Sequence, residues 1–296
     1  MSEPGPPRLR VGIIGVGRAG AVLGAALARA GHPVVAVSAV SELSRLRAQA
    51  LLPGVPIVDV PSVIEAADLV LVAVPDDVLP ELIRGLAETG NVRAGQFWAH
   101  PAGRYGVEVL DPVTALGALP LAIHPVMTFT GTSVDLARLA DCPFGVTAPG
   151  ELRTAAEALV LEMGGDPVWV PEEHRATYHA ALAYGANYLI TLVTQSLELL
   201  TNAGVEQPQR LMAPLLSAAL DNALRLGDQA LTGPVSRGDA ASVAEHLRAI
   251  EIVSAEAALG YRALARLTAD RAVAAGLLRA VDAENLLAVL GEGGSR

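Results

Sequence analysis

The chain has 296 residues, of which 52% are hydrophobic and 18% charged, and all 21 basic residues are arginine. With 31 acidic residues the formal net charge is −10, which argues against a nucleic-acid partner because such binding depends on neutralising phosphates. The absence of lysine excludes a P-loop kinase, a Schiff-base enzyme and a dehydrogenase that protonates a carbonyl from lysine.

The N-terminal half alternates short apolar runs with segments of helical period, which is typical of a parallel sheet with helices between its strands. Gly31 is expected to end the first helix, and Ser41 to cap the second. Asp76 and Asp77 are interpreted as capping and first-turn residues of a later helix rather than as catalysts. The expected strands are 9–15, 34–40, 57–58, 68–74, 96–100, 121–124, 143–148 and 168–170, and the expected helices are 18–30, 41–47, 78–87 and 151–163.

From Glu172 onward almost every segment has helical period. We expect helices at 172–203, 207–226, 239–268 and 282–290, the third with a break near Glu251. The fold class is therefore α/β, a doubly wound, mostly parallel Rossmann domain followed by an all-α domain. The expected limits are 8–171 for the dinucleotide-binding domain, 172–291 for the helical substrate and dimerisation domain, and frayed tails at 1–7 and 292–296.

One segment, residues 176–197, is long and uncharged, but its histidine, asparagine, glutamine, tyrosines and threonines make it too polar for lipid. We interpret it as a helix buried among other helices, and we expect no membrane partner. The only cysteine, Cys142, cannot form an internal disulfide, and this fits a reducing cytoplasm.

A glycine-rich turn follows the first expected strand and opens the first helix, which is the context in which GxGxxG binds a dinucleotide. The first glycine permits the tight turn, the second admits the pyrophosphate, and the third lets helix and sheet pack closely. The alternative is a purely structural glycine-rich turn. The motif comprises Gly15, Val16, Gly17, Arg18, Ala19 and Gly20.

The end of the second strand favours NADP over NAD. NAD enzymes usually place an acidic residue there, whereas this chain has Ser38 and no acid before Glu42. A small hydroxyl leaves room for a 2′-phosphate, with Ser41 nearby and Arg45 or Arg47 as its cationic partner. The alternative for the arginines is a solvated helix face.

Three later segments end strands at the same expected edge of the sheet, where ligands bind in open α/β folds. The backbone of Ala73, Val74 and Pro75 is expected to pass close to the cofactor. His100 and His124 each close a strand in a His-Pro pair, His100 as a cofactor contact and His124 as a proton donor. The alternative for both histidines is a structural role.

Two sets of polar residues in the helical half are candidates for substrate chemistry. His179 and Asn187 are eight residues apart and so share one helix face, as a proton donor and an orienting amide, or alternatively as a buried structural pair. In the turn before Asp239, the substrate candidates are Thr232, Ser236 and Arg237, of which Arg237 could hold a carboxylate. The alternative is an ordinary turn, and the pattern predicts no metal site.

Five motifs, GIIGVGRAG, DLVLVAVPDD, IHPVMTFTG, YHAALAYGANYL and LTGPVSRGD, together resemble a bacterial family with a Rossmann-like N-terminal part and a helical C-terminal domain of unknown function. That family is similar in architecture to pyrroline-5-carboxylate reductase, ketopantoate reductase and the β-hydroxyacid dehydrogenases. The resemblance implies a nicotinamide cofactor, a helical domain like that of 6-phosphogluconate dehydrogenase, and a homodimer formed through it.

The resemblance also shows where this chain differs. The hydroxyacid dehydrogenases and ketopantoate reductases have Lys four residues before the asparagine that matches Asn187, and here that position is Ala183. His179, one turn earlier, is the nearest replacement. Family members commonly read His-Thr-Ser-Gly where this chain has His-Pro-Ala-Gly at 100–103, so two hydroxyls are missing.

We therefore expect a cytoplasmic NAD(P)H-dependent oxidoreductase that reduces a small keto or imino acid by hydride transfer in an interdomain cleft. An imine suits a site without lysine because it can arrive already protonated. The alternative is a non-catalytic NADP-binding sensor or partner protein on the same fold. A deazaflavin in place of NADP, or beside it, is a third hypothesis.

Overall fold

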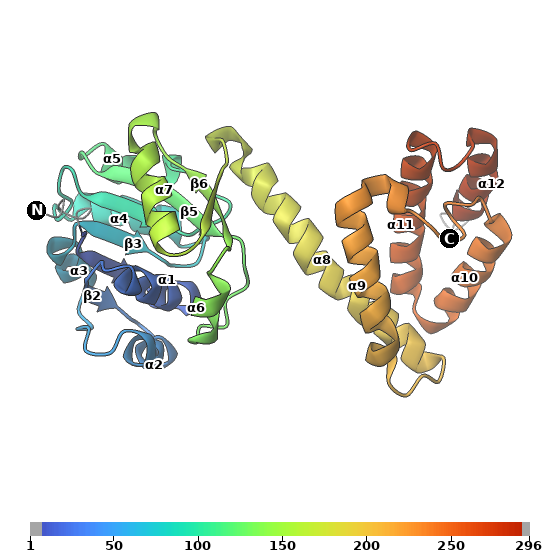
Figure 1. The fold of residues 1–296 in the computed structure, drawn as a ribbon, viewed down its shortest axis with the longest axis horizontal. Helices are drawn as coiled ribbons and strands as arrows, with labels where there is room; N and C mark the ends of the chain where they lie inside the picture. Colours follow the sequence, from blue (N-terminus) through green and yellow to red (C-terminus); the bar gives the residue numbers. More distant parts are fainter. Residues whose placement is uncertain (1–7, 292–296) are drawn as a thin grey trace, which may run out of the picture. The chain divides into compact units, whose positions relative to one another are not determined.

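The computed structural model describes residues 8–291, so the tails predicted at 1–7 and 292–296 lie outside the described residues. The chain divides into two compact units, one ending at Ala183 and the other starting at Tyr184 (Figure 1). This division falls within one long helix, α8 (Arg175–Asn202), and the predicted domain limit at 171/172 stays a prediction.

The first unit contains a seven-stranded sheet in the order β2-β1-β3-β4-β5-β6-β7. All neighbouring strands are parallel except β5 and β6, which confirms the predicted mostly parallel α/β fold. The predicted strand at 57–58 is reduced to a single bridge between Ile57 and Val37. The strands are β1 (Val11–Ile14), β2 (Val34–Ser38), β3 (Leu69–Val72), β4 (Phe97–His100), β5 (Leu119–Pro125), β6 (Pro143–Thr147) and β7 (Asp166–Trp169).

Helices cover both faces of this sheet because its central strands are apolar on both sides. Ile13 packs in a core with helices α1, α2 and α7, while the next residue, Ile14, packs in a second core with α3, α4 and α5. The helices of this unit are α1 (Arg18–Arg29), α2 (Glu42–Leu51), α3 (Val60–Ala66), α4 (Leu79–Glu88), α5 (Asp111–Thr114), α6 (Val134–Arg138), α7 (Arg153–Glu162) and three short 3-10 helices at Glu108–Leu110, Gly150–Leu152 and Glu172–His174.

The residues at the ends of these helices were predicted with mixed success. Gly31, at φ +95°, follows the end of α1, and the predicted cap at Ser41 is confirmed because its hydroxyl accepts the Ser44 N–H. The predicted caps at Asp76 and Asp77 are wrong. Helix α4 begins two residues later, after Val78, with no side-chain cap, so the aspartates lie in the turn after β3.

The start of α8 (Arg175–Asn202) is attached to the sheet by a buried arginine. Arg175 is 2% exposed, and its guanidinium donates to the Thr147 hydroxyl at 2.7 Å and to the carbonyl oxygens of Gly145 at 3.0 Å and Ala122 at 3.2 Å. Strands β5 and β6 supply all three acceptors. The arginine therefore determines where α8 leaves the sheet.

The second unit is helical, with a core formed by α10, α11 and α12 around Leu247, Ala269 and Leu286. The predicted break in the third helix is confirmed, at Ser254 rather than at Glu251. The Asp239 side chain caps α10 by accepting the Ser242 N–H. The predicted burial of 176–197 is wrong for the single chain, because most of its side chains are exposed. Besides the end of α8, this unit contains α9 (Pro208–Leu226), the 3-10 helix Gly227–Ala230, α10 (Ala240–Val253), α11 (Ala255–Ala274) and α12 (Ala280–Gly291).

Candidate cofactor and catalytic site

The carboxyl ends of the parallel strands form the edge on which the candidate site is built. From β1 the chain passes to β2 on one side and later to β3 on the other, so the strand order reverses between β1 and β3. Ligands of open α/β sheets bind in the crevice at such a switch point. Gly15 follows β1 and Ala73 follows β3, and they flank this point.

The glycine-rich turn has the geometry that a pyrophosphate requires. Gly15 has φ +91°, and a Cβ there would lie 2.7 Å from the Ala73 carbonyl oxygen. A Cβ on Gly20 would clash with the Gly15 carbonyl oxygen, whereas a Cβ on Gly17 would have nothing within 4 Å. Since α1 has no side-chain cap, the N–H groups of its first turn remain available to a ligand. This cradle fits a dinucleotide phosphate.

The predicted ribose contacts lie beside the same turn. Ser38 is buried at the end of β2, and the Gly15 N–H faces its carbonyl oxygen at 3.3 Å and its hydroxyl at 3.4 Å. Ser41 uses its hydroxyl to cap α2. Arg45 is exposed, whereas the Arg47 Nε lies 2.8 Å from the position of a Cβ on Gly131, in the loop after β5.

His100, at the end of β4, forms hydrogen bonds with the backbone of the loop that follows this strand. The His100 ring is fully buried, accepts the Ala102 N–H on Nδ1 at 3.2 Å, and lies 2.8 Å from the Gly106 carbonyl oxygen through Nε2. Because both ring nitrogens have partners, a cofactor contact at this position would come from the backbone. The predicted cofactor role of His100 stays a prediction.

Two of the predicted catalytic histidines lie close together, and a tyrosine joins them. The Tyr178 hydroxyl and His124 Nδ1 form a 2.8 Å hydrogen bond, and the ring centroids of His124 and His179 are 6.4 Å apart. A Cβ on Gly103 would lie 2.7 Å from His179 and 2.9 Å from His124, so this glycine allows both rings to pack over the loop after β4.

Tyr178 was missed by the sequence reasoning, which followed the helix face of His179 and Asn187. The available signal was the spacing of Arg175 and Tyr178, which are three residues apart and therefore neighbours on one helix face. The Arg175 guanidinium carbon lies 5.6 Å from the Tyr178 ring centroid. Burial raises the pKa of the Tyr178 phenol, so its hydroxyl is protonated at neutral pH.

Both strand-end histidines are neutral at pH 7. Burial, with the positive charge of Arg175 adding to it, lowers the pKa of His124 to about 4 and that of His100 to about 4. Arg175 forms no salt bridge within residues 8–291, and the Glu172 carboxylate acts on its charge only from beyond ion-pair distance. His124 therefore offers a neutral imidazole rather than an imidazolium.

The remaining predicted site residues lie in the second unit. Asn187 is exposed on α8. In the turn before α10, the buried Ser236 donates its hydroxyl to the Gly233 carbonyl oxygen at 3.1 Å and closes the turn, while Arg237 and Thr232 are exposed. Their predicted roles toward a substrate stay predictions.

Two searches of the described residues bear on other classes of site. Between residues 8 and 291, His, Cys, Asp and Glu side chains do not gather in any group of three or more that could hold a metal ion. Over the same residues, every helix is too short or too polar to cross a membrane.

Comparison with known domain families supports the same organisation. A Rossmann-like domain matches residues 2–125, and a domain of unknown function, DUF2520, matches residues 142–268. The chain is a Rossmann-like domain followed by a DUF2520 domain. This confirms the predicted resemblance.

Curated relatives match part of the chain. They are the glycerol-3-phosphate dehydrogenases (NAD(P)+) of two strains of Stenotrophomonas maltophilia, 30% identical over 176 residues, or 53% of this chain and 49% of each relative. The chain thus spans about half the length of the curated relatives it matches.

Solved structures share the fold over nearly the whole chain. A candidate NADP oxidoreductase of Bacteroides fragilis aligns with a TM-score of 0.72 at 23% identity, covering 89% of this chain and 98% of that one. A reductive aminase of Aspergillus terreus in complex with NADPH aligns at 0.68 and 18% identity, covering 95% and 99%. A Plasmodium falciparum pyrroline carboxylate reductase with NADP bound aligns at 0.55 and 9% identity, covering 89% and 98%.

The glycine turn makes a direct prediction about stability. Gly15→Ala is expected to lower the free energy of unfolding by at least about 2 kcal/mol, because a side chain at φ +91° is strained and its Cβ meets the Ala73 carbonyl. Gly17→Ala, with open space around the new Cβ, is expected to change it by less than about 1 kcal/mol. Denaturant titration followed by tryptophan fluorescence measures this, since both tryptophans, Trp98 and Trp169, lie in the first unit.

The lowered histidine pKa values predict a pH dependence. Between pH 6.5 and about 4 the unfolded chain binds a proton at His124 that the folded chain does not. The stability of the first unit should therefore be highest above pH 6.5 and fall as the pH approaches 4. His124→Gln is expected to remove on the order of 2 kcal/mol of that fall between pH 7 and 4.5. The matched control, His174→Gln at an exposed position, should leave the fall unchanged.

Proposed function

We propose that the protein is an NAD(P)H-dependent reductase of a small keto or imino acid. The observation that carries the proposal is the open, uncapped glycine cradle at α1, on the same sheet edge as His124 and its tyrosine partner. Five parallel strands, from β2 to β5, form this edge, which spans about 19 Å at about 4.8 Å per strand. That length suits an extended dinucleotide.

The cofactor would lie along this edge and supply the hydride when bound. The free N–H groups of the first turn of α1 would bind the pyrophosphate, Ser38 the ribose, and the backbone at Ala73–Pro75 the nicotinamide half. We favour NADP because β2 ends in Ser38 without an acid, with Arg45 and Arg47 nearby. The NADP and NADPH complexes of the structural neighbours support this choice. A deazaflavin remains the alternative cofactor.

His124 would act as a neutral hydrogen-bond donor to the substrate. In the tautomer in which Tyr178 donates to Nδ1, the single ring proton is on Nε2, and a neutral imidazole can polarise a carbonyl in this way. His179 is the second candidate for the proton, since Ala183 stands where related enzymes have lysine. A weakly acidic site favours an imine, which can arrive already protonated.

The second candidate function is a non-catalytic NADP-binding sensor. It is favoured by the same low acidity of His124, by Ala183 in place of lysine, and by Pro101 and Ala102 in place of two hydroxyl residues. Tight NADPH binding without turnover of any keto acid or imine in a panel would support this function over the reductase.

We also propose that the helical unit forms a homodimer. Large apolar side chains are exposed on α8 and α9, among them Tyr184, Ile190, Leu215 and Leu224, at 61%, 66%, 62% and 80%. Rows of exposed apolar residues on long helices usually mark a protein interface. A second copy of the same chain would cover them in a symmetric pair.

Cofactor binding tests the proposed function directly. The protein is expected to bind NADPH more tightly than NADH in titration calorimetry. Gly17→Asp should weaken NADPH binding at least about 100-fold, because its carboxylate would face the pyrophosphate. Since a Cβ at this position meets no atom within 4 Å, the thermal unfolding midpoint should stay unchanged. Absence of NADPH and NADH binding by the wild-type protein would exclude the reductase.

The arrangement of His124 predicts the effect of its partner. Tyr178→Phe is expected to lower kcat about 10- to 100-fold on any substrate that is turned over, because His124 loses the hydroxyl that holds its tautomer. Its Kd for NADPH should not change. Tyr105→Phe, half-buried in the same unit, is the matched control. If His124→Gln and His179→Gln both keep full turnover, neither histidine is the proton donor to the substrate.

A further inference from the structure

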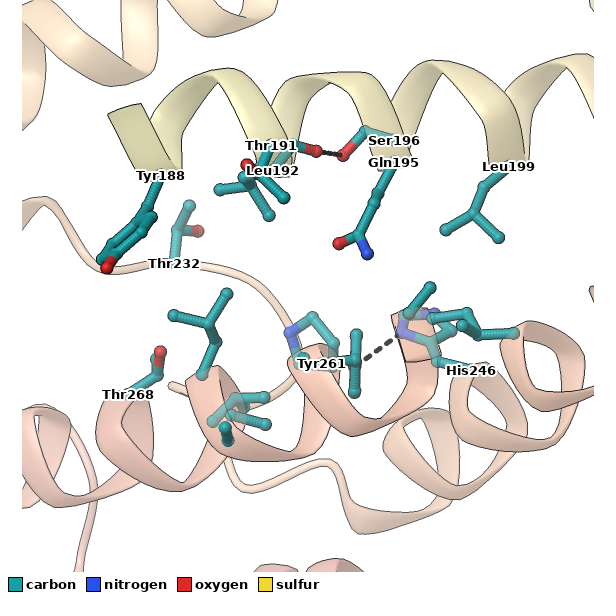
Figure 2. Close-up of a pocket in the computed structure, with 18 residues that line it drawn as sticks. Tyr188, Thr191, Leu192, Gln195, Ser196, Leu199, Thr232, His246, Tyr261 and Thr268 are labelled. Carbon is teal, nitrogen blue, oxygen red and sulfur yellow. Dashed lines mark hydrogen bonds between the residues drawn. The ribbon is translucent and has the colours of Figure 1, made fainter. Parts of the chain in front are cut away.

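The second unit contains a cavity of its own. Its volume is about 610 Å³, within the roughly 300–1,000 Å³ typical of small-molecule sites. One stripe of α8, formed by Tyr188, Leu192, Gln195 and Leu199, makes one wall, and α10 and α11 make the opposite wall (Figure 2). The turn that begins at Thr232 closes one end.

Small residues on α11 keep the cavity open. Ala257, Gly260 and Ala265 face it. A Cβ on Gly260 would have only the Gln195 Oε1 within 4 Å, at 3.8 Å, which is an ordinary contact. A larger side chain at 260 would therefore extend into the cavity without first striking the backbone.

A few polar groups gather inside this otherwise apolar space. Gln195 projects from α8 toward the opposite wall, where His246 Nδ1 and the Tyr261 hydroxyl are hydrogen-bonded at 3.0 Å (Figure 2). The Gln195 amide lines the cavity, and an amide can both donate to and accept from a ligand. An apolar cavity with a few convergent polar groups is the usual form of a ligand site.

The charge of the cavity limits what it can bind. None of its described lining residues is Asp, Glu or Arg. A buried carboxylate or phosphate would lose its hydration here without a cation to replace it, and this costs several kcal/mol. The walls therefore select against ionic ligands.

We propose that this cavity binds a neutral small molecule with a ring-sized or branched apolar body and one carbonyl or hydroxyl group, which Gln195 recognises. The cavity shares no residue with the cradle at α1, and the proposal does not require the proposed reductase function. Of the residues proposed to face a second copy, Ile190 lies on the opposite face of α8, whereas the Tyr184 ring packs edge-on against the cavity-lining Tyr188 ring.

Cyclohexyl methyl ketone and cyclohexanecarboxylate are matched probes, because they share the ring and differ in charge. Titration calorimetry on the full chain at pH 8 should show the ketone binding at least about 10-fold more tightly than the carboxylate. Gly260→Leu should weaken ketone binding at least 10-fold, whereas Gly260→Ala should keep it. Gln195→Met should weaken it about 3- to 10-fold, the effect of one lost hydrogen bond. This second variant keeps the test valid if Gly260→Leu misfolds.

Several outcomes would overturn the proposal. They are no ketone binding by the wild-type protein, equal binding of the carboxylate, or ketone binding unaffected by both Gly260→Leu and Gln195→Met. Sedimentation provides a further outcome that would overturn the proposal. If the wild-type protein sediments as a dimer and Gly260→Leu as a monomer, the second copy fills the cavity. NADPH affinity should be the same in all variants, so failure of this site and failure of the proposed reductase are distinguishable.

Discussion

The buried guanidinium of Arg175 connects the architecture of the first unit to its chemistry. It is a buried positive charge among carbonyl and hydroxyl oxygens of β5 and β6, and no carboxylate of residues 8–291 forms a salt bridge with it. Removing a charge from water is costly, and here three hydrogen bonds from the guanidinium offset part of that cost. The bonds attach the first turn of α8 to the sheet. Tyr178 and His179, on that turn, come to lie beside His124 as a result.

Burial, with the same charge adding to it, determines the protonation state of the site. His100 and His124 are buried near a permanent cation, so both disfavour a second positive charge and stay neutral. Neutral imidazole can donate a hydrogen bond but is a weak acid. This distinguishes the chain from related enzymes that use lysine, and it is why the nature of the substrate, rather than an acidic side chain, is expected to account for the proton.

The two units differ in the ligands that their surfaces suit. The edge of the sheet presents free backbone N–H groups and nearby arginines, which attract phosphates. The cavity between α8 and α11 presents alkyl groups, hydroxyls and an amide, which suit a neutral molecule. The edge of the sheet is therefore expected to bind a charged cofactor, and the cavity to bind an uncharged organic compound.

The sequence by itself determined the fold class and the glycine cradle. Both rest on local patterns, since apolar runs and glycines at fixed spacing act within one strand or one turn. Only the tertiary structure decided which polar side chains meet. The bond between Tyr178 and His124 joins residues 54 apart in the chain, and the Arg175 bonds reach back as far as Ala122. No local period encodes such contacts, because they depend on the order of the strands and on where α8 begins. The cavity was likewise invisible in the sequence, because small residues on α11 leave space only when α8 packs opposite them.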